Sequence, residues 1–276
     1  MSDTESILFL ASATMYAISA AAYIFSMTFR KDHWTVRASQ FAVLGAVFHT
    51  VSLALRWIEG GHGPYETMFE ILSSTALVAV LVFLIVQYKM DKIKLTGVLV
   101  MPALFIMMGI TATLPQEISP ITPSLQSYWL IAHIGFAKLA YGSVLIGTSC
   151  GIFYIFKSGK ESVSNFYERL PSLEALDDLS YRFIAAGFLF IAVMVATGAV
   201  WANKTWGSYW SWDPLETWSL VSWFTYGIYL HLRLTHGWYG KKAAYVSIVG
   251  MIVLIFTIFI ASTVFSLSDH SAYMNI

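Results

Sequence analysis

The chain has 276 residues, of which 57% are hydrophobic and 12% charged, and its formal net charge is zero. Soluble globular domains carry about 25% charged residues, and a nucleic-acid-binding chain shows a basic excess. The composition therefore excludes an ordinary soluble domain and gives no indication of a nucleic-acid partner. It predicts an all-α, polytopic integral membrane protein.

Eight apolar runs approach or exceed the roughly 20 residues that a helix needs to cross the hydrocarbon core of a bilayer. They cover about 6–29, 38–58, 67–88, 96–113, 127–156, 182–202, 215–235 and 243–266. No Lys or Arg precedes Arg30, so the first run lacks the basic segment of a cleaved signal peptide and is expected to remain as a span. The lone Cys150 is expected to be a small buried hydrophobe. We expect a single membrane domain over 1–276.

Basic residues gather on alternate connections. One set of connections holds Arg30, Lys31, Arg37, Lys89, Lys92, Lys94, Lys157, Lys160, Arg169, Arg182, Arg233, Lys241 and Lys242. The other set holds Lys204 and, at a span end, Arg56. Because cytoplasmic connections are enriched in Lys and Arg, both termini and the connections 59–66, 114–126 and 203–214 are expected to face the periplasm or its equivalent. The long cytoplasmic connection at about 157–181 is polar, and a short surface helix capped by Ser172 is plausible there.

The first outer connection reads G-G-H-G-P-Y-E-T from Gly60. Glu66 and Glu70 follow at i,i+4 spacing on one face of the third span. A cap or an interfacial charge would explain Glu66, whereas Glu70 lies a turn inside the membrane, where ionisable groups usually face protein or a cavity. Arg56 lies at the same surface. These three residues are candidates for a secondary role at the site, and His62 is a weaker candidate for contact with a ligand.

The connection at about 203–217 contains the run W-G-S-Y-W-S-W-D-P, from Trp206 to Pro214. Aromatic residues near a span end are usual at the membrane interface. Four of them in seven residues exceed that expectation, and the small residues Gly207 and Ser208 let a large flat object approach the backbone. We interpret Trp206, Trp210 and Trp212, with Gly207 and Asp213, as a platform for a planar apolar ligand.

Four histidines are candidate ligands. His133, near the outer end of the fifth span, and His270, after the eighth span, share the expected level of the Trp-rich loop. Two imidazoles above an aromatic platform suit the two axial faces of an iron macrocycle. His231 lies roughly 20 Å below the outer surface, and His49 falls at a similar depth, so either could belong to a second ligand pair. Arg233, two residues after His231, could meet an anionic group near the inner side.

The run W-G-S-Y-W-S-W-D-P-L-E-T-W-S-L, followed by Y-L-H-L-R and H-G-W, resembles the tryptophan-rich "WWD" signature of heme-handling proteins. With eight spans, His133 about two spans earlier and the closing D-H-S-A-Y that contains His270, the pattern resembles the CcsA/ResC family of the system II cytochrome c synthase. The likeness is strongest over about 128–273. Ala272 departs from the family's usual H-S-Y ending.

The resemblance implies that His133 and His270 are the outer axial ligands of heme b and that His231 is a transmembrane ligand. It implies that a CcsB/ResB-type subunit supplies the other transmembrane histidine, with His49 as the alternative. Heme would be relayed across the membrane and presented in reduced form for attachment to the CxxCH segment of apocytochrome c, a heme lyase activity of the complex. Two alternatives are a chaperone that only holds and hands on heme, and a non-heme transporter whose Trp-rich loop is an interfacial belt.

Overall fold

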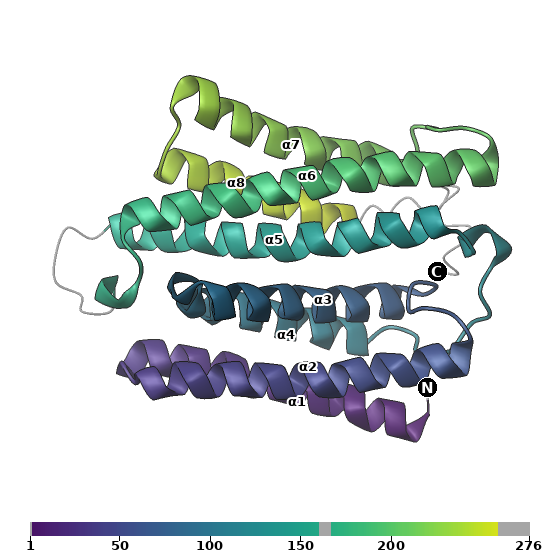
Figure 1. Ribbon diagram of the computed structural model, residues 1–276, viewed down its shortest axis with the longest axis horizontal. Coiled ribbons are helices and arrows are strands. Elements are labelled where there is room, and N and C mark those ends of the chain that lie inside the picture. Colours follow the sequence, from purple (N-terminus) through teal and green to yellow (C-terminus); the bar gives the residue numbers. More distant parts are fainter. Residues whose placement is uncertain (1, 160–166, 259–276) are drawn as a thin grey trace. The chain divides into compact units, whose positions relative to one another are not determined.

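The computed structural model describes residues 2–159 and 167–258, and these residues form helices joined by short connections, with no strand among them (Figure 1). The α-helices are α1 (Asp3–Phe29), α2 (Asp32–Gly60), α3 (Met68–Lys89), α4 (Gly97–Ala112), α5 (Tyr128–Ser158), α6 (Leu173–Trp206), α7 (Pro214–His236) and α8 (Lys241–Phe256). Short 3-10 turns are η1 (Asp91–Thr96), η2 (Pro123–Leu125) and η3 (Tyr167–Arg169).

Six helical segments in the described part of the chain are long and apolar enough to cross a membrane: α1, α2, α3, η1 with α4, α5 and α6. The chain is therefore an all-helical, multi-pass membrane protein, as the composition predicts. Helix α7 coincides with the seventh expected span, but it carries Glu216, His231, Arg233 and His236 among its apolar residues. Helix α8 is described as far as Phe256, so the end of the eighth expected span lies outside the described residues.

The observed helix boundaries differ most from those expected from the sequence at α6. Ser172 is the N-cap expected from the sequence, and its side chain accepts a hydrogen bond from the Ala175 amide at 3.2 Å. The helix that begins there is not a separate surface helix, because it runs without interruption to Trp206. The expectation of a short independent helix was therefore wrong. Its 34 residues give α6 a length of about 51 Å, compared with roughly 30 Å of hydrocarbon.

The helices divide into two compact units. Unit 1 comprises Met1–Ile121 with Ser162–Pro171, and it contains α1 to α4. In this unit α1 packs against α2 and α4, and α3 packs against α2 and α4. Tyr23 is fully buried and donates to Gln87 Oε1 at 2.7 Å. Its ring lies where a side chain on Gly97 would clash, so the small residue lets α4 approach closely.

Unit 2 comprises Thr122–Glu161 with Ser172–Ile276, and its described helices are α5 to α8. Helices α5 and α6 lie side by side and antiparallel over most of their length (Figure 1). Their close approach depends on Gly187 of α6, where an added Cβ would lie 2.5 Å from Val144 of α5. Helix α8 packs against α5 and α7. The single membrane domain expected over 1–276 thus consists of two compact units.

Candidate functional site

His133 lies on α5, five residues after the helix begins, so it is about 8 Å from the N-terminal end of that helix. Its Nδ1 is 2.8 Å from the carbonyl oxygen of Met194 on α6. A carbonyl can only accept, so Nδ1 carries the proton and a neutral ring has its lone pair on Nε2. This is the tautomer in which histidine binds a metal through Nε2 while a backbone carbonyl fixes the ring.

Gly198 provides the space for the His133 ring. A Cβ added at this position on α6 would lie 2.6 Å from Nδ1 and 2.9 Å from Cε1 of His133. Real Cβ atoms do not make contacts this short, so any larger residue would displace the ring or separate the helices. The glycine and the Met194 carbonyl together determine where the imidazole of His133 lies against α6.

The tryptophans of the Trp-rich loop form two pairs. Trp206 packs edge-on against Trp201, with ring centroids 4.9 Å apart. Trp201 is buried, and its Nε1 donates to the Ser124 carbonyl at 2.9 Å. Trp210 and Trp212 form the second edge-on pair, at 5.7 Å. The structure therefore ties the beginning of the loop to α6 and to η2, whereas Trp212 is 68% exposed.

Asp213 is the N-cap of α7. Its Oδ1 accepts from the Glu216 amide at 2.9 Å, and Pro214 occupies the first turn, where the missing amide proton costs nothing. The Glu216 carboxylate in turn accepts from the Ser211 amide at 2.7 Å. These bonds close the loop onto the start of α7, so the carboxylate predicted to belong to the platform has a direct structural role.

Trp212 has a φ of 60°, in the left-handed region that residues with a large side chain rarely adopt. Such a conformation costs about 1–3 kcal/mol and persists only where the surroundings enforce it. Here the Asp213 cap and the Ser211–Glu216 bond lie on either side of the strained residue. Gly207 ends α6 with a φ of 77°, which glycine adopts without strain. The loop is thus a defined turn that holds one tryptophan outward.

The remaining predicted ligands lie in different places. His270 lies outside the described residues. His231 is exposed on α7, five residues before the helix ends, so it is about 8 Å from the C-terminal end of that helix. It continues an exposed apolar stripe on α7 formed by Val221, Phe224 and Ile228. His49 lies in unit 1 and is fully buried, with Nδ1 3.2 Å from the Tyr16 hydroxyl and Nε2 2.8 Å from the Ser73 hydroxyl.

The charged residues that were predicted to have a secondary role at the site form contacts within the protein. Arg56 is buried and donates to Glu70 at 2.7 Å, to Glu5 at 3.2 Å, and to the carbonyls of residues 116 and 117. Glu70 also accepts from the amide of Glu66 at 2.8 Å, and Glu66 is itself buried. In unit 2, Arg233 forms a bidentate pair with Asp177 of α6. The structure thus occupies Arg233 with a carboxylate of the protein itself.

Sequence reasoning missed three residues of α5 and α6. Gly198 gave no pattern by which it could be found. Lys204 was noted only as a topological charge, yet its ammonium lies 5.7 Å from the centre of the Trp129 ring. Lys138 is half-buried in the middle of α5, five residues deeper than His133. Lys138 could have been found from the sequence, because an ionisable residue inside a span indicates function by default.

Comparison with known proteins identifies the family. The profile of the cytochrome c assembly protein family matches residues 65–267. A cytochrome c biogenesis protein CcsA from Trieres chinensis is 33% identical, over 84% of this chain and 86% of its own. A CcsA protein from Prochlorococcus marinus is 37% identical, over 76% of each chain.

A solved structure titled cytochrome c heme lyase CcmF superposes with a TM-score of 0.72 at 12% identity. The match covers 92% of this chain and 46% of the other, so the present chain spans about half of that protein and the likeness concerns the fold alone. The profile match and the relatives show that the chain belongs to the CcsA family of cytochrome c biogenesis proteins, with a role in cytochrome c maturation.

Proposed function

We propose that the protein relays heme b across its membrane and presents it, reduced, on the periplasmic or lumenal side for covalent attachment to apocytochrome c. The observation that carries the proposal is the geometry of His133. Its Nδ1 lies 2.8 Å from the Met194 carbonyl, which fixes the ring in the tautomer that binds a metal through Nε2. This ring lies on α5 against α6, the helix that continues into the Trp-rich loop.

At the outer site, His133 and His270 act as axial ligands, and the Trp-rich loop from Trp206 to Asp213 covers the macrocycle. Two neutral imidazoles and an aromatic surrounding with little water favour ferrous heme. Each thiol of a CxxCH segment then adds across one vinyl group. A sulfur–carbon bond forms and the thiol hydrogen passes to the other vinyl carbon, so the addition itself consumes no oxidant. The histidine of the CxxCH segment replaces one of the two protein ligands.

The deep site is assigned to His231. Its imidazole lies exposed on an apolar stripe of a transmembrane helix, where a charged ring would be costly and a neutral ring can face a partner. His49 would have to give up a hydrogen bond to Tyr16 or Ser73 before it could bind iron. Both observations support a CcsB/ResB-type subunit as the source of the second transmembrane histidine. The catalytic unit is then the complex, with its outer site facing the periplasm or the thylakoid lumen.

The test is the visible spectrum of the complex purified in mild detergent. The native complex should carry heme with the spectrum of bis-histidine iron and should mature a CxxCH reporter. His133→Gly and His270→Gly should each abolish maturation, with partial recovery on added imidazole, and should leave the deep site able to load. His231→Gly should deplete both sites, because a relay fills the outer site through the inner one.

Three outcomes would contradict the proposal in different ways. A colourless native complex would indicate a non-heme transporter. A complex that binds heme but never transfers it to a CxxCH reporter under reducing conditions would indicate a chaperone. Full outer-site heme in the His231→Gly variant would exclude the relay and leave only the outer ligation site.

A further inference from the structure

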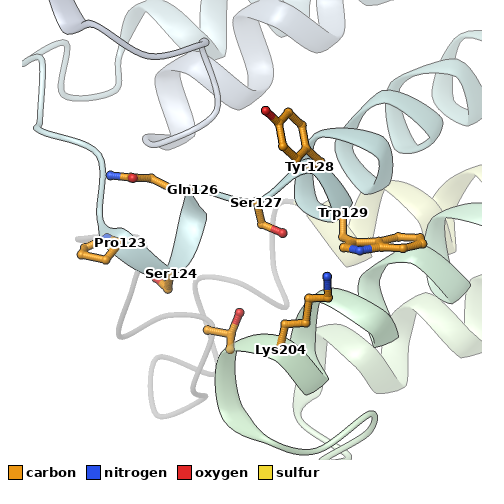
Figure 2. A pocket seen from close by; sticks show the side chains of 8 residues that line it. Pro123, Ser124, Gln126, Ser127, Tyr128, Trp129 and Lys204 are labelled. Atoms are coloured by element: carbon orange, nitrogen blue, oxygen red, sulfur yellow. The ribbon is translucent and has the colours of Figure 1, made fainter.

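A cavity of about 590 Å³ opens at the outer end of the α5–α6 pair. It is lined by Pro123, Ser124, Gln126, Ser127, Tyr128, Trp129, Lys204 and Thr205, all of unit 2 (Figure 2). Figure 2 shows the Lys204 side chain reaching from α6 toward Trp129 and Ser127 at the beginning of α5. The cavity therefore lies between a lysine and the N-terminus of a membrane helix.

We infer that this cavity is a binding site for the propionate carboxylates of heme, with Lys204 as the cation that holds them. Outer connections of membrane proteins are poor in basic residues, and this chain has two such residues, Arg56 and Lys204. Arg56 is neutralised by two buried carboxylates. Among the residues that the structure describes, no carboxylate lies within ion-pair distance of Lys204. Its charge is directed over the Trp129 ring and into the cavity.

Several other polar groups of the cavity can donate hydrogen bonds. The first amides of α5 have no partner within their own helix, and its N-cap, Ser127, makes no capping hydrogen bond with its side chain. The positive end of the helix dipole therefore faces the cavity. The hydroxyl of Ser124 is buried and has no hydrogen-bond partner among the described residues. A lysine, a hydroxyl and a helix N-terminus at one place suit an anion with several oxygen atoms.

The distance of the cavity from His133 indicates which anion it binds. Gly198, which lies against the His133 ring, is six residues before Lys204 on α6, so the lysine is about 9 Å further out along the helix axis. Trp129 is four residues before His133 on α5, about 6 Å further out. The two carboxylates of heme share one edge of the macrocycle, at the end of flexible arms. Iron bound at His133 thus places that edge within reach of Lys204 when the propionates point outward.

This inference rests on the proposed function and extends that function by fixing the orientation of heme at the outer site. With the propionates held at Lys204, the opposite edge of the macrocycle points deeper along α5 and α6. The vinyl groups occupy positions on the sides and the far edge, away from the charged end. The carboxylates would remain in the polar interface while the apolar part of the ring stays among apolar side chains.

The experiment compares heme with its dimethyl ester, which keeps the macrocycle and the vinyl groups but lacks the negative charges. Both are titrated into the heme-depleted complex, and binding is followed by the His133-dependent absorption. The native complex should bind heme about tenfold more tightly than the ester, as expected for a charge-assisted contact. Lys204→Met should remove that preference by weakening heme alone, and Lys204→Arg should retain it. Lys89→Met, an exposed lysine at the inner end of α3, is the control and should change neither affinity.

The outcomes separate this inference from the proposed function. An unchanged tenfold preference in Lys204→Met overturns the propionate site but leaves the outer heme site intact. If neither heme nor the ester gives a His133-dependent spectrum in the native complex, both proposals fail. A third arm repeats the titration with added phosphatidylglycerol. If Lys204→Met loses binding of this lipid and keeps its preference for heme, the cavity holds a lipid headgroup and the propionate assignment is wrong.

Discussion

The two units handle charge in opposite ways. In unit 1, Arg56 is 1% exposed and bound to Glu5 and Glu70, with two further bonds to backbone carbonyls. In unit 2, Lys204 is exposed beside a cavity and has no acidic partner among the described residues. The first charge is satisfied by the fold and the second is available to a ligand.

This difference distinguishes a charged residue that maintains the fold from a charged residue that can bind a ligand. The Arg56 network joins the beginnings of α1 and α3, the end of α2 and the connection after α4, so it fixes the shape of this end of unit 1. In unit 2, hydrogen bonds position individual groups, such as the ring of His133 and the start of α7. Substitutions in unit 1 should therefore affect stability, and substitutions in unit 2 should affect heme.

The largest effect is expected at Arg56. Arg56→Met would leave Glu5 and Glu70 buried without their cation, and breaking a buried ion pair in this way costs about 3–5 kcal/mol. Thermal unfolding of the detergent-purified protein should show a large loss of stability, with an unchanged heme spectrum in the fraction that remains folded. A stable Arg56→Met protein that has lost heme would reverse the comparison and make Arg56 part of the ligand site.

The next effect is expected at Gly198. Gly198→Ala places a Cβ 2.6 Å from the His133 Nδ1, so the ring must move. We expect the affinity of the outer site for heme to fall at least about tenfold, or about 1.4 kcal/mol. The spectrum of the remaining heme should change, while the unfolding temperature changes little. Gly135→Ala is the matched control, because an added Cβ there meets nothing within 4 Å. Equal heme affinity in both variants would show that Gly198 does not position His133.

A smaller effect is expected at Asp213. Asp213→Ala removes the N-cap of α7 and should cost about 1 kcal/mol of stability, whereas Asp213→Asn keeps a capping oxygen and should cost much less. Unfolding temperature and heme content are measured for both variants. If Asp213→Asn retains stability but loses heme, the negative charge itself acts on the ligand, and the residue belongs to the platform as well as to the cap.

The smallest effect is expected from the buried His62 of unit 1. Its Nδ1 and Nε2 lie 2.8 and 2.9 Å from the carbonyls of Gly63 and Ser119, so both nitrogens donate when the ring is protonated. Burial lowers the pKa of His62, but the two carbonyls and the negative charges of Glu70 and Glu66 outweigh it, and the net pKa is raised above 6.5.

A raised pKa in the folded state means that protonated His62 stabilises the fold. That stabilisation is complete below the unfolded pKa of about 6.5 and is lost as the pH rises through the folded value. The unfolding temperature should therefore decline over this range. His62→Gln should remove this part of the pH dependence without altering bound heme. An identical pH profile in the variant would show that His62 does not titrate with folding.

The helices could be predicted well from the sequence because a helix is indicated by neighbouring residues, such as an apolar run and a capping residue. Long apolar runs predicted most of the described helix ends within a few residues, and Ser172 is the cap that the sequence predicted. The main error was to separate residues 173–181 from the span that they begin. The candidate site was less predictable. His133 could be selected by its depth, but its tautomer depends on a carbonyl 61 residues away. Gly198 and Lys204 acquire meaning only when the pairing of α5 and α6 is known.

Helix α6 also connects two contacts that lie near its opposite ends. Asp177, near its inner end, is paired with Arg233, two residues from His231 on α7. Gly198, near its outer end, supports the ring of His133. Gly198 follows Asp177 by 21 positions, a rise of about 32 Å along the helix, and no proline lies between them. A helix of this kind transmits an axial displacement instead of absorbing it, so a movement of the Asp177–Arg233 pair would reach His133 near the other end of α6.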